Sequence, residues 1–93
     1  MPNINVSTSA KLNDKDKLLE DILILISTLT NKSRSFVMAK IDDNCQMYFG
    51  DKTSSCFLEV KSIGSLNPLE MAKPISDFVY EKMGIPIDRI YIS

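Results

Sequence analysis

The chain has 93 residues, which fits one domain because domains usually run to about 100–150 residues. Apolar residues make up 44% and charged residues 25%, a globular composition that excludes a disordered, collagen-like or disulfide-stapled chain. The net charge of −1 excludes the strong positive charge that nucleic-acid binding requires. Because so small a core is marginal alone, we expect the chain to oligomerise.

The chain contains no histidine, which excludes Ser-His-Asp and Cys-His catalysis and any His-ligated metal. Cys45 and Cys56 match no zinc or redox spacing, so we expect reduced thiols in a cytoplasmic protein without metal or cofactor. The N-terminus has no signal-peptide pattern, although non-classical secretion stays open. The longest apolar run, residues 22–26, is too short to span a membrane.

The first half of the chain predicts a strand, a helix and a second strand. Residues 3–8 alternate polar and apolar side chains, as strands do. Asn13 predicts a helix cap, and the apolar positions after it recur with helical spacing up to Asn31 and Lys32. Residues 36–41 predict the second strand, and residues 47–50 are either a short strand or a connection.

The second half repeats this plan. Residues 57–62 predict a strand, and residues 89–93 predict a last strand. Between them, the Asn-Pro-Leu-Glu run at 67–70 predicts the start of a helix. Pro74 predicts a kink or a restart of the helix, and Gly84 predicts its end. The β-α-β-β-α-β order predicts an α+β fold in which both helices cover one face of a four-stranded mixed sheet. Apolar strand residues on both faces indicate that something covers the other face.

Pro2 is the first candidate for chemistry. The small residue at position 2 permits removal of Met1, which would leave a secondary amine at the start of a strand. An α-amino group titrates near neutrality, and burial or a nearby cation lowers its pKa, so the neutral nitrogen can act as a general base. A retained Met1 would acylate this nitrogen and abolish its basicity. Met-Pro starts are common, so a proline without catalytic function stays an alternative.

Lys32 is the second candidate. The helix after the first strand runs back along the sheet, which brings its C-terminal end, and so Lys32, near Pro2. A lysine that only meets the helix dipole is the alternative. Two further candidate segments have plain structural alternatives. Residues 61–64 are compatible with an ordinary turn, and residues 88–93 with a strand that has a charged lead-in.

Several motifs occur in a specific order along essentially the whole chain. They are Met1-Pro2, Lys32 followed by Phe36-Val37-Met38, Met47-Tyr48-Phe49-Gly50, Lys61-Ser62-Ile63-Gly64, and Gly84-Ile85-Pro86-Ile87-Asp88-Arg89-Ile90-Tyr91-Ile92. Together with the predicted fold, these motifs resemble the tautomerase superfamily, and within it the macrophage migration inhibitory factor and D-dopachrome tautomerase group.

The resemblance implies a homotrimer whose sheets wrap into a barrel with helices outside and active sites at subunit interfaces. It implies that Pro2 moves a proton between keto and enol forms of small aromatic α-keto acids such as phenylpyruvate. Lys32 would hold the carboxylate or enolate oxygen. The other substrate-binding positions that it implies are Phe36, Ser62, Ile63 through its backbone, Tyr91 from a neighbouring subunit, and Ser93. It implies no metal.

Three features depart from the family pattern. Asn31-Lys32-Ser33 replaces Gly-Lys-Pro, which we expect to loosen the lysine. Cys56 has no partner three residues later, so we expect no thiol–disulfide activity. The chain stops at Ser93, whereas family members continue for roughly 20 residues, enough for two short strands. We therefore expect a weaker trimer and reduced or lost activity.

Two other functions stay open. One is a catalytically weak binding or cytokine-like signalling module on the same trimeric fold, with an unidentified protein receptor. The other is a ferredoxin-like module unrelated to tautomerases. The chain lacks an aromatic RNA-binding motif, which argues against a nucleic-acid version of the latter.

Overall fold

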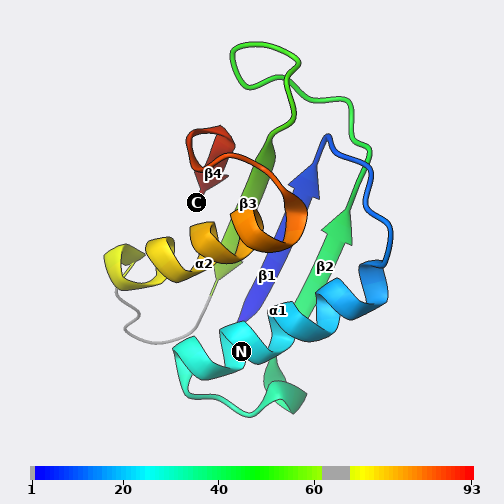
Figure 1. Cartoon of the computed structure of the whole chain (residues 1–93). Helices are drawn as coiled ribbons and strands as arrows, with labels where there is room; N and C mark the ends of the chain where they lie inside the picture. Colours follow the sequence, from blue (N-terminus) through cyan, green and yellow to red (C-terminus); the bar gives the residue numbers. More distant parts are fainter. Residues whose placement is uncertain (1, 62–67) are drawn as a thin grey trace.

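The structure is a computed structural model that describes residues 2–61 and 68–93 (Figure 1). Its elements follow the chain as β1 (Asn3–Thr8), α1 (Lys15–Thr30), the 3-10 helix η1 (Arg34–Phe36), β2 (Met38–Asp42), β3 (Cys56–Lys61), α2 (Pro68–Met83), the 3-10 helix η2 (Ile87–Arg89) and β4 (Ile90–Ile92). The predicted β-α-β-β-α-β order is confirmed, while the two 3-10 turns were not predicted.

The four strands form one mixed sheet in the order β2-β1-β3-β4. β1 is parallel to β2 and antiparallel to β3, and β3 is parallel to β4. Each β-α-β unit therefore supplies one parallel pair, and the two pairs meet along β1 and β3. Both helices lie across the same face of the sheet, which confirms the predicted α+β class (Figure 1).

The core lies between the sheet and the two helices. Ile4, Val6 and Thr8 point into it from β1, and each is at most 2% exposed. Both helices bury residues spaced four apart, which is the spacing of one helix face. These residues are Leu18, Ile22 and Ile26 of α1, and Met71, Ile75 and Val79 of α2. The alternation in β1 therefore fixes which face of the sheet the helices cover.

The opposite face of the sheet is polar at its centre. Asn3, Asn5 and Ser7 alternate with the buried residues of β1 and so point away from the helices. Register puts apolar side chains on this face too, at positions that include Phe57 and Tyr91. The apolar residues expected there are present, but they lie toward the ends and edges of the sheet.

Some element boundaries differ from the predicted ones. α1 is capped by Asp14, not Asn13, because the Asp14 carboxylate accepts a hydrogen bond from the Lys17 N–H at 3.1 Å. β2 begins at Met38 rather than at residue 36, because the residues before it form η1, in which the Phe36 N–H donates to the Ser33 carbonyl.

The second helix runs without a break through Pro74, so the predicted restart is wrong. Packing of Ile75 and Val79 into the core outweighs the hydrogen bond that a proline cannot make. Gly84 has a φ of 70°, which confirms the predicted helix end. The predicted cap Asn67 lies outside the described residues. Within residues 2–61 and 68–93, no helix is both long enough and apolar enough to cross a membrane.

Candidate functional site

Pro2 lies at one end of the sheet, between two neighbouring strands. It is buried, and its carbonyl accepts a hydrogen bond from the Met38 N–H at 3.1 Å, where β2 begins. On the other side, Asn3 pairs with Lys61, the last residue of β3. The first residue of the central strand is therefore flanked by the start of one strand and the end of another.

Lys32 follows the C-terminal end of α1, and its backbone is held on both sides. Asn31 ends the helix in the left-handed conformation with a φ of 54°, which asparagine tolerates nearly as well as glycine. The Lys32 N–H donates to the Ser27 carbonyl at 3.2 Å, and the Ser27 hydroxyl donates to the Lys32 carbonyl. The expected looser placement of Lys32 stays a prediction. The Lys32 side chain is exposed.

Phe36 lies on the short connection between Lys32 and β2. It is the last residue of η1, and 57% of it is exposed. Because β1 and β2 are parallel, the end of α1 and the start of β2 lie at the same end of the sheet as Pro2 (Figure 1). Three residues that sequence reasoning singled out thus come to one end of the molecule. Ser62 and Ile63 follow Lys61 and lie outside the described residues.

Tyr91 and Ser93 lie elsewhere in the same chain. Tyr91 pairs with Phe57, which pairs with Ser7 of β1. Ser7 is about 16 Å along the strand from Pro2 at 3.3 Å per residue, and β4 is two strands away from β1. The Ser93 N–H donates to the Leu58 carbonyl at 2.8 Å, which extends the parallel pairing of β4. A single chain therefore does not bring Tyr91 to Pro2.

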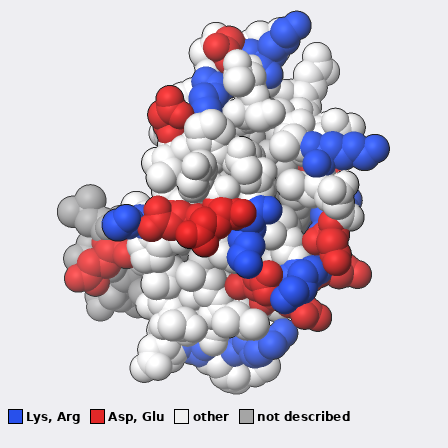
Figure 2. Space-filling model, in the orientation of Figure 1, with Lys and Arg blue, Asp and Glu red and all other residues white. Residues whose placement is uncertain are grey.

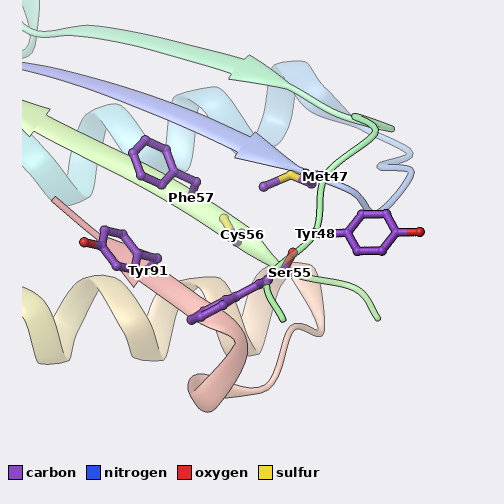
Figure 3. A pocket seen from close by; sticks show the side chains of 7 residues that line it. Met47, Tyr48, Ser55, Cys56, Phe57 and Tyr91 are labelled. Atoms are coloured by element: carbon purple, nitrogen blue, oxygen red, sulfur yellow. The ribbon is translucent and has the colours of Figure 1, made fainter. Parts of the chain in front are cut away.

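Tyr91 lines an aromatic hollow of about 300 Å³ at its own end of the sheet (Figure 3). The residues that line it are Met47, Tyr48, Phe49, Ser55, Cys56, Phe57 and Tyr91. The rings of Phe57 and Tyr91 stack with centroids 5.6 Å apart, and Phe49 meets Tyr91 edge-on at 6.2 Å. In Figure 3, Met47 extends toward Cys56 while the Tyr48 ring points outward. Sequence reasoning missed this hollow, although the Met-Tyr-Phe run at 47–49 was its signal.

Arg89 holds the loop that borders this hollow. Its guanidinium donates to the carbonyls of Phe49 at 2.6 Å and Thr53 at 2.9 Å, and pairs with the Asp51 carboxylate at 3.1 Å. It also lies 5.1 Å from the centre of the Phe49 ring. The Thr53 hydroxyl, then its N–H, and the Arg89 charge lower the pKa of Asp51. Arg89 is therefore more than a charged residue before a strand, because it is the main anchor of residues 49–54.

The two cysteines are free, with Cys45 partly exposed and Cys56 buried. Burial raises the pKa of the Cys56 thiol to about 12, so it stays protonated near neutral pH and is a poor nucleophile. In the part of the chain that the structure describes, no three His, Cys, Asp or Glu side chains gather as a metal site would require. The groups that the structure brings to the Pro2 end include the proline itself, the Lys32 side chain and the Phe36 ring.

Comparison with known proteins places the chain in a family. The family model described as "Macrophage migration inhibitory factor (MIF)" matches residues 1–93. Macrophage migration inhibitory factor of Xenopus tropicalis is 29% identical over 98 residues, which cover 100% of this chain and 85% of that protein.

Solved structures agree. The homologue from Prochlorococcus marinus superposes with a TM-score of 0.91 at 30% identity, over 98% of this chain and 84% of that one. The protein of Trichinella spiralis gives 0.86 at 25% identity, over 97% and 84%. The chain belongs to the macrophage migration inhibitory factor family, within the tautomerase superfamily.

Proposed function

We propose that this protein is a keto–enol tautomerase for small aromatic α-keto acids such as phenylpyruvate, with the Pro2 nitrogen as general base. Family membership supports a function of the tautomerase superfamily in general. The observation that supports this reaction most is the meeting of Pro2, Lys32 and Phe36 at one end of the sheet. These three supply a base, a cation and an aromatic surface.

In the proposed mechanism, Met1 is removed and the free Pro2 amine is neutral. The nitrogen takes the proton from the carbon α to the substrate carbonyl, and the carbonyl oxygen becomes an enolate. The protonated proline then delivers the proton to that oxygen, which gives the enol, and the reverse sequence gives the ketone. The Lys32 ammonium holds the carboxylate or stabilises the enolate charge. The exposed Phe36 ring contacts the ring of the substrate. Ser62 and Ile63 add hydrogen bonds in this proposal.

We further propose that the working protein is a homotrimer in which another copy supplies Tyr91 and Ser93. Within one chain Tyr91 is far from Pro2, so it can line the Pro2 site only from a second copy. The aromatic hollow around Tyr91 suits the ring of an aromatic substrate. The polar centre of the open sheet face, with Asn3 and Asn5, suits a hydrated barrel interior. Free thiols support a cytoplasmic setting.

The test combines intact-mass spectrometry, which reports removal of Met1, with a phenylpyruvate assay. General acid–base catalysis contributes about 100-fold or more, so Pro2→Gly should lower kcat/KM by at least about that factor. Lys32→Ala should lower it about tenfold to 100-fold, because it removes an electrostatic contact to the developing charge. Lys82→Ala, which removes an exposed lysine in the last turn of α2, on the helix-covered face of the sheet, should have no effect. A Met1-free protein with no rate above buffer would contradict the proposal. Receptor binding that survives Pro2→Gly would then favour the signalling alternative.

A further inference from the structure

The segments that meet at the Pro2 end of the sheet carry basic residues but no acidic ones. The chain as a whole has 12 acidic and 11 basic residues, so such a bias is not a property of its composition. Three stretches lack Asp and Glu altogether, and they are residues 2–13, 22–41 and 60–69. Their basic residues are Lys11, Lys32, Arg34, Lys40 and Lys61, of which Lys32, Arg34 and Lys61 concern the Pro2 end.

Register places these three cations around Pro2. Lys61 pairs with Asn3, the residue after Pro2, at the end of β3. Arg34 begins η1, on the connection from Lys32 to the start of β2, where Met38 bonds to Pro2. Positive charge therefore approaches Pro2 from both neighbouring strands. Figure 2 shows Lys and Arg atoms along the lower edge of the molecule, where α1 ends.

These cations are available to a ligand. All three side chains are exposed, and within residues 2–61 and 68–93 none of them makes an ion pair. The cations that are paired lie elsewhere, and they are Lys15, Lys17, Lys40, Lys73 and Arg89. The acids nearest to Lys61 in sequence are Glu59 on β3 and Glu70 in the first turn of α2, and neither makes an ion pair with a cation of the Pro2 end.

We propose that Arg34 and Lys61 form, with Lys32, a cationic rim around the Pro2 site that selects α-keto acids bearing a second carboxylate. This inference rests on the proposed tautomerase function and names its preferred substrate class. Lys32 holds the α-carboxylate, and the planar guanidinium of Arg34 suits the second carboxylate because it can donate two parallel hydrogen bonds. Lys61 adds to the positive potential that draws a dianion to this end.

The test compares phenylpyruvate, which has one carboxylate, with 4-carboxyphenylpyruvate, which has two. The Met1-free wild-type protein should have the lower KM for the dianion. Arg34→Gln and Lys61→Gln should each raise the KM for the dianion by about fivefold, as expected for exposed charges. Neither variant should change kcat or the KM for phenylpyruvate by more than about twofold. Raising the salt concentration should reduce the preference in the wild type.

Lys82→Gln is the matched control, because Lys82 is an exposed lysine with no ion pair among the described residues and lies in the last turn of α2, apart from the aromatic hollow. It should leave both KM values unchanged. Equal KM values for the two substrates in the wild type would overturn the proposed rim, as would Arg34→Gln and Lys61→Gln variants that both behave like Lys82→Gln.

Failure of the rim and failure of the tautomerase function are distinguishable. If Pro2→Gly is inactive while the two substrates show equal KM values, the reaction stands and the rim does not. If the protein turns over neither substrate, calorimetric titration with 4-carboxyphenylpyruvate still tests the rim. The wild type should then bind it more tightly than Arg34→Gln and Lys61→Gln do, and equal affinities would refute the rim.

Discussion

Phe57 and Tyr91 face each other across the parallel β3–β4 pair, with their rings stacked at 5.6 Å and inclined by 13°. Their place in the sheet separates Tyr91 from Pro2 by about 16 Å along the strands, by the 3.3 Å rise per residue. This arrangement makes one chain an incomplete site if Tyr91 takes part in the reaction. Complementation between copies is therefore the consequence to test.

Mixing two inactive variants should restore activity. Pro2→Gly subunits retain Tyr91, and Tyr91→Ala subunits retain Pro2, so some interfaces in a mixed trimer carry both native residues. Random assembly after joint refolding at equal concentrations should repair about a quarter of the sites, since each site takes its two residues from adjacent copies in a closed ring. Activity of the mixture that never exceeds the mean of the two separate variants would show that Tyr91 is not shared between copies.

Ser27 should support substrate binding through Lys32. Ser27→Ala removes the hydroxyl that donates to the Lys32 carbonyl, which should let the end of α1 fray. The KM for phenylpyruvate should rise about threefold, the size of a lost surface hydrogen bond, with kcat nearly unchanged. Ser27→Thr should restore the KM. Thr28→Ala is the control, because the Thr28 hydroxyl donates within the helix, to the Ile24 carbonyl at 2.8 Å. Equal effects of the two alanine variants would remove the special role of Ser27.

Arg89 should stabilise the loop at residues 49–54 more than any surface charge can. Arg89→Gln loses hydrogen bonds from a charged donor to several carbonyls, and the free energy of unfolding should fall by about 2 kcal/mol. Arg34→Gln is the control, since Arg34 is exposed and should change that free energy by less than about 0.5 kcal/mol. Urea unfolding checks both values. A loss of unfolding free energy in Arg89→Gln that is no larger than in Arg34→Gln would contradict the anchoring role.

Acid should destabilise the connection between β1 and α1 through Asp43. The Leu12 N–H at 2.9 Å, and then the Lys15 ammonium at 3.1 Å, lower the pKa of the Asp43 carboxyl below its ordinary value. Its stabilising effect is therefore complete above the pKa of the unfolded chain and is lost as the pH falls through the lower folded value. Asp43→Asn should flatten the loss of stability between about pH 5 and pH 2. Thermal unfolding across that range checks this, and parallel curves for the wild type and Asp43→Asn would be inconsistent with it.

The sequence pattern predicts those parts of the molecule that depend on local periodicity. Apolar spacing at residues 18, 22 and 26 identifies the buried face of α1, and the β-α-β order alone brings Lys32 toward Pro2. The exact start of α1 is harder to predict, because Asn13 and Asp14 are both good N-cap residues. The hydrogen bond from the Lys17 N–H decides in favour of Asp14. The Arg89 anchor joins residues about 40 positions apart, which no local pattern contains.

The most direct test of the central claim is incorporation of solvent deuterium at the methylene carbon of phenylpyruvate, next to its ketone, followed by proton NMR in D₂O. Protein shown by mass spectrometry to lack Met1 should exchange this position well above the buffer rate. Pro2→Gly should exchange about 100-fold more slowly or worse, and a fraction that retains Met1 should be inactive because its Pro2 nitrogen is an amide. Exchange by Pro2→Gly, or by Met1-bearing protein, at the wild-type rate would contradict the role of the Pro2 nitrogen as the base.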